Sequence, residues 1–320
     1  MTPEIAVAVP SHDRPLRLRW LLNALEEQTL DRDRFEVVAG HDSSGPETER
    51  LLRDHPLAGA GVLRGVRLTP GSALPGRNRN AAWRAARAPL IAFTDDDCRP
   101  PPAWLETALS AARRHPGAVV QGATEPDPEE AHLLKAPHAR TQRVVPPSAY
   151  AEACNILYPR ELLERLGGFD ERMRAGEDAE LAMRAAEVGA ARMAAPEMLT
   201  WHGVATPWLG SRLRAVWRWR DLPKLAKRHP THRAAYPLGI FWKRSHAWLP
   251  LAAAGALLGK RSVGWAALAV PWVVAAMPFY GRHPRARLRS LSELPGRAAI
   301  DATEFAALAW GSAKHRTLFL

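Results

Sequence analysis

Short apolar runs alternate with segments of helical periodicity throughout residues 1–202, and this alternation constrains the fold more than any other feature. The runs typical of strands are Ile5–Pro10, Phe35–Ala39, Val62–Leu68, Pro89–Thr94, Val119–Gly122, Ala153–Tyr158 and Arg192–Trp201. The helical segments are Leu16–Gln28, Glu47–Leu52, Asn80–Arg87, Trp104–Arg114, Glu161–Leu166 and Asp178–Val188. Residues 124–147 are rich in Pro and charge, and we expect a loop there. This alternation predicts an α/β domain with a mostly parallel sheet and helices on both faces.

Charge is distributed unevenly along the chain. Residues 1–202 hold 25 Lys and Arg against 29 Asp and Glu, whereas residues 203–320 hold 19 against 4 and also contain 8 of the 12 Trp. We therefore expect a mildly acidic domain over 1–202 and a basic, Trp-rich helical tail over 203–320. A basic, Trp-rich segment favours an anionic partner, such as membrane headgroups, phosphorylated lipid or nucleic acid.

Two uncharged runs in the tail, 247–259 and 262–281, are separated by Lys260 and Arg261. The second run has 20 residues, which is long enough to span a bilayer. Lys260 and Arg261 would each cost about 2.5–3.5 kcal/mol at the bilayer centre, so an interfacial hairpin is an equal alternative. The alternative without a membrane is a pair of helices packed on the first domain. We expect residues 247–281 to be membrane-associated and to contact an anionic leaflet.

The compartment is indicated by two further features. Cys98 and Cys154 are too few for a disulfide framework and suit a reducing compartment. The first 20 residues carry Glu4, Asp13 and several Arg without an apolar core, so they do not resemble a secretory signal. Together with the basic tail, these features predict a location at the cytoplasmic face of the membrane.

Three consecutive aspartates, Asp95, Asp96 and Asp97, follow the predicted strand Pro89–Thr94. Adjacent carboxylates repel one another, and a bound cation that prefers oxygen ligands, Mg²⁺ or Mn²⁺, would relieve the repulsion. The carboxyl end of a parallel strand is also where open α/β sheets bind ligands. The alternative is a solvated acidic turn with Asp97 as a cap, and the motif alone leaves both interpretations open.

Other charged residues occur at predicted strand ends and helix starts. Glu177 and Asp178 begin a helix, where a carboxylate is either a cap or a general base. Asp42 follows the second strand and either binds a base or ribose or forms an Asx turn. Arg77 and Arg79 open another helix and either neutralise a diphosphate or remain solvated.

Four segments, in this order, resemble the family-2 glycosyltransferases of the GT-A fold. IAVAVPSHDRP is similar to their first strand and loop, and FEVVAGHDSSG to their second strand with its DDGS element. PGRNRNAAWRAARAPLIAFTDDDC is similar to their ARN segment and DxD strand. NILYPRELLERLGGFDERMRAGEDAELAMRAAEVG is similar to their acceptor-side block, with a GGFDE element and the ED motif. The resemblance covers about residues 4–202 and implies a GT-A fold, a Rossmann-like sheet flanked by helices.

The resemblance also implies roles in donor binding. Asp42 would contact the nucleobase, Arg77 the nucleotide, and Asp95, with Asp96 beside it, the ribose side of the donor. Asp97 would be the main metal ligand and Asp95 a second one. The first Asp of DDGS is His41 here and its Gly is Ser43, which changes the residues that select the nucleotide.

On the acceptor side, the resemblance implies that Asp178 is the general base and that Glu177 shapes the acceptor site. His202 occupies the position where some GT-A enzymes keep a His for the metal or the diphosphate; a structural histidine is the alternative. Cys154 stands where the family has a small residue, and we expect it to be buried rather than nucleophilic.

These features predict an inverting, metal-dependent glycosyltransferase that uses a nucleoside-diphosphate sugar. The expected acceptor is a hydroxyl of a carbohydrate or lipid-linked molecule, a precursor of glycolipid or cell-surface polysaccharide. A sugar-phosphate nucleotidyltransferase is the alternative enzyme, but its Gly-rich, Lys-bearing loop is missing after Pro10. A non-catalytic basic protein that binds nucleic acid or membrane is the other alternative; uncharged runs in the tail argue against nucleic acid.

Overall fold

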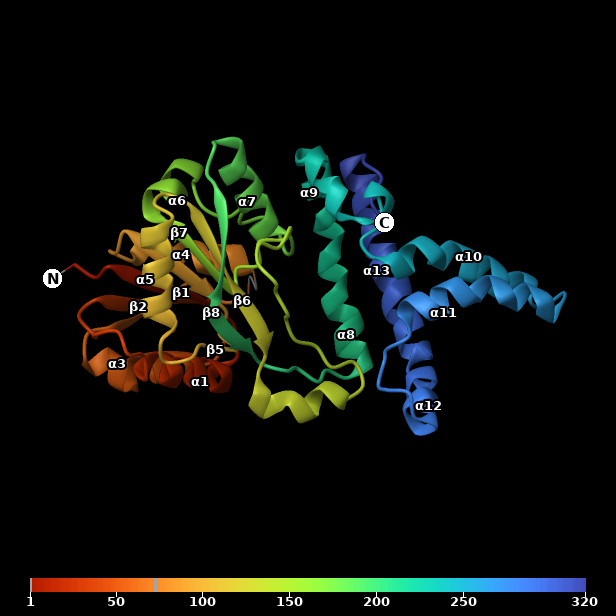
Figure 1. The fold of residues 1–320 in the computed structure, drawn as a ribbon, viewed down its shortest axis with the longest axis horizontal. Helices are drawn as coiled ribbons and strands as arrows, with labels where there is room; N and C mark the ends of the chain where they lie inside the picture. The colour runs from red at the N-terminus through yellow and green to blue at the C-terminus, as the bar shows by residue number, and fades with distance from the viewer. Residues whose placement is uncertain (1, 72–73) are drawn as a thin grey trace. The chain divides into compact units, whose positions relative to one another are not determined.

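The computed structural model describes residues 2–71 and 74–320, which form two compact units (Figure 1). The first unit contains the chain up to Ala131 together with Thr141–Val204, and the second contains His132–Arg140 and Ala205–Leu320. The first unit is built on a β-sheet, whereas the second consists of helices and connecting segments.

An eight-stranded sheet forms the centre of the first unit, in the order β3-β2-β1-β4-β7-β6-β8-β5. The strands are β1 (Ile5–Ser11), β2 (Phe35–His41), β3 (Leu63–Arg67), β4 (Leu90–Thr94), β5 (Cys98–Arg99), β6 (Val119–Pro126), β7 (Asn155–Pro159) and β8 (Arg192–His202). Strands β3, β2, β1 and β4 are parallel neighbours, as are β6 and β8. Strand β7 is antiparallel to β4 and β6, and β5 is antiparallel to β8. The prediction of a mostly parallel α/β sheet is confirmed.

Helices cover both faces of the sheet. They are α1 (Pro15–Glu26), α2 (Glu47–Asp54), α3 (Pro56–Gly59), α4 (Pro75–Ala85), α5 (Trp104–Arg114), α6 (Arg160–Leu166) and α7 (Glu177–Glu187). Successive side chains of a strand point to opposite faces. In β1, Ile5 and Val7 therefore join the core formed with α1, α2, α3 and α5, whereas Ala6 and Ala8 join the core formed with α4, α6 and α7. Burial on both faces explains why the strands are continuous apolar runs.

Two local predictions differ from the structure. Helix α4 begins at Pro75 and not at Asn80, because proline suits the first turn of a helix, where its missing N–H is not needed. Arg77 and Arg79, expected at the opening of this helix, lie within its first turns together with Asn78. Residues 124–147, predicted to be a loop, contain the end of β6 and the 3-10 helix η1 (Pro128–Lys135).

The second unit is helical, as expected for the tail. Its elements are α8 (Leu209–Val216), η2 (Trp217–Asp221), α9 (Leu222–Arg228), η3 (Pro230–Ala235), η4 (Pro237–Gly239), α10 (Arg244–Leu258), η5 (Val263–Ala269), α11 (Val270–Ala276), α12 (Pro284–Ser292) and α13 (Leu294–His315). The uncharged run 262–281 is divided between η5 and α11, because Pro271 starts a new helix and Pro278 follows its end. Among residues 2–71 and 74–320, no helix has the length and apolar character needed to cross a membrane.

Candidate active site

The candidate functional side chains lie where strands of the first unit end. Parallel pairing aligns Ser11 of β1 with His41 of β2, and β4 runs beside β1 in the same direction. The residues that follow these strands therefore meet at one edge of the sheet. This edge receives the loop of His12 and Arg14, Asp42, and the three aspartates Asp95–Asp97. Helix α4 adds Asn78 and Arg79, and helix α7 adds Glu177 and Asp178.

Arg79 pairs with carboxylates from two parts of the chain, the aspartates after β4 and the start of α7. Its Nη2 donates to Asp95 Oδ1 at 2.7 Å, and its Nη1 donates to Glu177 Oε1 at 2.9 Å and to Asp178 Oδ1 at 3.1 Å. The side chain is only 5% exposed. Burial alone would lower the pKa of Arg79, but the three carboxylates hold it above its usual value. The guanidinium is therefore a permanent positive charge at the centre of the site.

Asp178 is held at the first turn of α7 with its carboxylate fixed at both oxygens. Oδ2 accepts a hydrogen bond from the backbone N–H of Ala153 at 3.0 Å, and Oδ1 accepts from Arg79. Gly176, just before the helix, has φ 82°, a left-handed conformation that suits glycine. Burial raises the pKa of Asp178 to about 7; Arg79 opposes this shift and Glu177 adds to it. Asp178 can therefore exchange a proton near neutral pH.

The three consecutive aspartates have different environments. Burial alone would raise the pKa of Asp95, but Arg79 and the other positive groups nearby lower it, so Asp95 is ionised. Asp96 is fully buried, accepts from Ser11 Oγ at 2.8 Å, and lies 2.6 Å from Arg14 Nη2; burial raises its pKa to about 7. Asp97 Oδ2 accepts from Arg14 Nη1 at 2.6 Å. Arg14 therefore separates the charges of Asp96 and Asp97.

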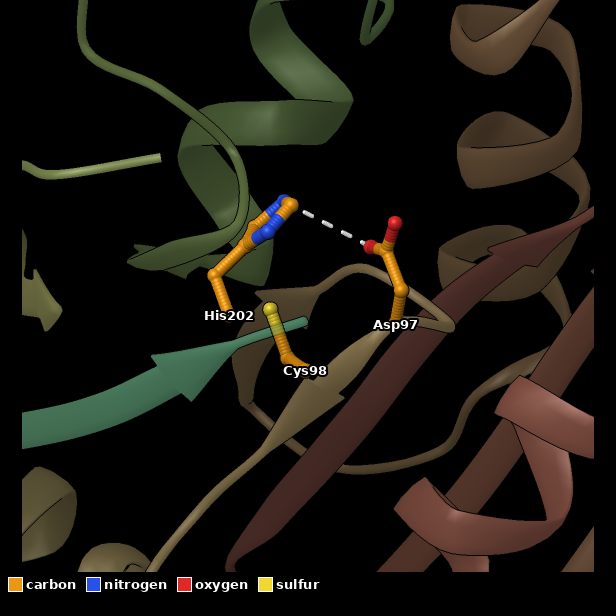
Figure 2. A group of neighbouring side chains, drawn as sticks. All are labelled: Asp97, Cys98 and His202. Atoms are coloured by element: carbon orange, nitrogen blue, oxygen red, sulfur yellow. Dashed lines mark ion pairs between the residues drawn. The ribbon is translucent and has the colours of Figure 1, made fainter. Parts of the chain in front are cut away.

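His202 lies beside Asp97, as Figure 2 shows. Its Nε2 is 3.5 Å from Asp97 Oδ1, and one ligand atom from each of Asp97, Cys98 and His202 lies within 4.8 Å of the others. The pairing of β5 with β8 places Cys98 directly opposite His202. His202 Nδ1 is 2.8 Å from the carbonyl oxygen of Gly203, which can only accept. Nδ1 therefore donates this hydrogen bond, and Nε2 is the ring nitrogen on the side of Asp97, the atom through which His202 could bind a metal.

Asp42, predicted to contact a nucleobase, is completely buried. Its Oδ1 lies 2.9 Å from both Asn78 Nδ2 and His12 Nδ1. The side chain of His12 is 38% exposed, whereas Asp42 is buried, so a ligand in solution would reach Asp42 only through His12. Arg77 is half-buried in the first turn of α4, beside Asn78.

The charges of the site favour a cation. Five carboxylates surround two guanidinium groups, which leaves three negative charges uncompensated when every carboxylate is ionised. A divalent ion would reduce this excess. Asp97 Oδ1 and His202 Nε2 provide oxygen and nitrogen donors at a separation that suits two ligands of one ion, and Mn²⁺ accepts this donor set. These residues therefore fit a divalent metal.

Sequence reasoning missed the pairing of Arg14 with Asp96 and Asp97, and it assigned to Arg79 only a diphosphate. It also missed Asn78 and His12, which hold Asp42. Arg14 and Arg79 each pair with residues at least 82 positions away, except for the pair of Arg79 with Asp95. The position of the two arginines could have indicated these pairs, because both lie near strand ends that share one edge of the sheet.

The fold and the arrangement of the site assign this protein to the GT-A class of glycosyltransferases. The structure resembles the mannosyltransferase PcManGT from Pyrobaculum calidifontis in complex with GDP-Man and Mn²⁺, with TM-score 0.55 and 22% identity over 99% of this chain and 88% of that one. It also resembles S. aureus TarS in complex with UDP, with TM-score 0.52 and 17% identity over 99% and 92% of the two chains.

The chain belongs to glycosyl transferase family 2, whose model matches residues 6–167. It is 28% identical over 268 residues to the pre-mycofactocin glycosyltransferase of Mycobacterium tuberculosis, an alignment that covers 80% of this chain and 54% of that protein. It is 31% identical over 209 residues to the O-antigen biosynthesis protein RfbC of Myxococcus xanthus, with coverage of 57% and 16%. The chain thus spans about half, or less, of the length of these relatives.

Proposed function

We propose that the chain is an inverting, metal-dependent glycosyltransferase that moves a sugar from a nucleoside diphosphate to an acceptor hydroxyl. The observation that carries the proposal is the position of Arg79, which connects Asp95 on the donor side with Asp178 on the acceptor side. The buried guanidinium of Arg79 thereby sets the separation between Asp95, the proposed nucleotide-binding carboxylate, and Asp178, the proposed base. Membership of glycosyl transferase family 2 supports the same reaction.

In this proposal, Asp178 accepts the proton of the acceptor hydroxyl. The hydroxyl oxygen forms a bond to the anomeric carbon while the bond from that carbon to the diphosphate oxygen breaks, and the electron pair leaves with the diphosphate. Attack from the face opposite the leaving group inverts the anomeric centre. Glu177 shapes the acceptor site, and Arg79, which pairs with Glu177, Asp178 and Asp95, holds Asp178 at a fixed separation from Asp95.

On the donor side, we assign Asp95 to the ribose and Arg77 to the diphosphate. Asp42 is assigned to the nucleobase, and His12 and Asn78 hold its carboxylate in place. Asp97 and His202 would hold Mg²⁺ or Mn²⁺, with Asp95 as a further ligand. When bound, the metal supplies positive charge that stabilises the departing diphosphate. Asp96 is fully buried, so we assign it a supporting role in nucleotide binding, through Arg14.

We further propose a glycolipid or cell-surface polysaccharide precursor as the acceptor, at the cytoplasmic face of an anionic membrane. The basic second unit supports this location, because exposed cations are attracted to anionic headgroups. A relative named for O-antigen biosynthesis supports the class of acceptor. Nucleic acid is not proposed as a partner.

Calorimetry with UDP, GDP and dTDP, each with and without Mn²⁺, tests the donor site. One nucleotide is expected to bind tightly, only with Mn²⁺, and Asp97→Ala is expected to abolish this binding because it removes an oxygen donor. Asp54→Ala, at an exposed ion pair in α2, is the matched control and should bind normally. Absence of binding to the folded parent protein would refute the nucleotide-sugar proposal.

The rate of transfer is expected to depend on pH through Asp178. Because the pKa of Asp178 is raised to about 7, the carboxylate is protonated and inactive below that pH and ionised above it. At saturating donor and metal, kcat should therefore fall about tenfold for each pH unit below 7. A rate that stays constant from pH 8 to pH 5 would contradict the assignment of the base.

A further inference from the structure

The second unit contains a helical hairpin formed by α10, η5 and α11; we call residues 247–281 the apolar hairpin. Helix α10 packs against both η5 and α11. Gly255 permits the close approach, because a Cβ at this position would lie 2.9 Å from the carbonyl oxygen of Trp265. Trp272 is buried and donates from Nε1 to Asp301 of α13 at 3.1 Å. One side of the hairpin is therefore used in packing within the unit.

The hairpin also exposes large apolar side chains to solvent. They are Trp248, Leu251, Leu257, Val263, Trp265, Val270, Val274, Met277 and Phe279. Val263 is 86% exposed and Phe279 is 82% exposed. They occur along α10, η5 and α11 and at Phe279 just beyond it, and exposed apolar side chains in this number mark an interaction site.

Charged residues of the apolar hairpin lie only at its turn, and further charged residues follow its last residue. Residues 247–259 and 262–281 contain no Asp, Glu, Lys or Arg. Lys260 and Arg261 lie exposed at the turn, and Arg282, Arg285 and Arg287 lie exposed just beyond the other end. The acidic residues that the hairpin contacts, Asp301 and Glu293, are buried, and the exposed charges at both ends are cations. Exposed apolar side chains between exposed cations are complementary to an anionic lipid bilayer.

We infer that the apolar hairpin lies flat in the interface of an anionic bilayer, with the exposed apolar side chains among the acyl chains. This orientation leaves the cations at both ends level with the headgroups, where Lys and Arg are favourable. Entry with the turn first is disfavoured. The 15-residue helix α10 is only about 22 Å long, so Lys260 and Arg261 would be placed inside a hydrocarbon layer of about 30 Å.

The inference adds a surface and an orientation to the proposed membrane partner, and it does not depend on transfer activity. It is tested by sedimentation of the full chain with vesicles of phosphatidylcholine alone or mixed with phosphatidylglycerol. The chain is expected to bind the anionic vesicles strongly and the neutral ones weakly. Replacing Arg282, Arg285 and Arg287 by Gln should weaken binding about 100-fold, since each cation near an anionic surface contributes about a fivefold factor.

An apolar variant, with Leu257, Val274 and Phe279 replaced by Ser, should also bind at least about tenfold more weakly, because apolar burial is lost. The matched control replaces Leu16, Val145 and Val188, exposed apolar residues of the first unit, by Ser and should bind like the parent. Equal binding of the apolar variant and the parent would overturn the inference. So would a dimer in sedimentation velocity that the apolar variant dissociates, since a second copy would then cover this surface.

The orientation is measured with nitroxide labels on Leu257→Cys, Val270→Cys and Phe279→Cys. A flat hairpin places the three labels at similar depth in the bilayer, as reported by oxygen and nickel accessibility. A depth that increases from residue 279 to residue 257 would show insertion with the turn first and would overturn the flat orientation. Nucleotide binding by these variants is measured separately, so that a failure of this inference is distinguishable from a failure of the proposed function.

Discussion

Asp178→Asn is expected to bind the nucleotide donor with unchanged affinity and to transfer sugar about 10²–10⁴-fold more slowly than the parent protein. The amide keeps the shape of the side chain, and its oxygen can accept from Ala153, but its NH2 group cannot accept from Arg79 and the side chain does not take up a proton. The measurement is single-turnover transfer at saturating donor, alongside calorimetry of donor binding. Asn should also remove the pH dependence of any residual rate.

The stability of Asp178→Asn provides a control with a defined sign. The pKa of Asp178 in the folded protein is raised above its unfolded value, so its favourable contribution is complete in acid and is lost as the pH rises through about 7. At pH 8 the neutral amide should therefore unfold no more easily than the parent. Glu187→Gln, at the exposed end of the same helix, should leave transfer unchanged. Rapid transfer by folded Asp178→Asn would contradict the role of Asp178 as base.

Arg79→Met is expected to reduce the free energy of unfolding by about 3–5 kcal/mol and to abolish transfer. Methionine fills similar space but leaves Asp95, Glu177 and Asp178 close together without their shared cation. Carboxylates in that arrangement repel one another and take up protons. Urea denaturation measures the loss of stability, and the midpoint should recover in part at low pH, where the carboxylates are neutral.

Two further variants test whether the loss of stability in Arg79→Met comes from the shared pairing with three carboxylates. Arg79→Lys retains the charge but not the planar fork that reaches three carboxylates, so its loss of stability should be intermediate. Arg84→Met, on the same helix but in a half-exposed pair with Glu171, should cost less than about 1 kcal/mol. Equal stability of Arg79→Met and Arg84→Met would contradict the central position of Arg79.

The differences between expectation and structure have a common origin. Strands such as β1 and β4 were predictable because their continuous apolar runs reflect burial on both faces. The antiparallel direction of β7 could not be predicted, because a run such as Ala153–Tyr158 has the same composition in either direction. Asp95, Asp97 and Asp178 were proposed from motifs, and their roles remain proposals. Their connection through Arg79 was absent from the sequence reasoning, because no local pattern indicates which of many arginines becomes buried.

Local chemistry was sufficient to predict the α/β architecture, the carboxylates after β4 and the helical nature of the tail. These features depend on periodicity, on proline and glycine, and on residues adjacent in the chain. The partnership of Arg14 with Asp96 and Asp97, the placement of His202 beside Asp97, and the burial of Trp272 against Asp301 were decided by tertiary structure. Each depends on contacts between residues distant in sequence, where strand pairing and helix packing select one partner among many that are chemically equivalent.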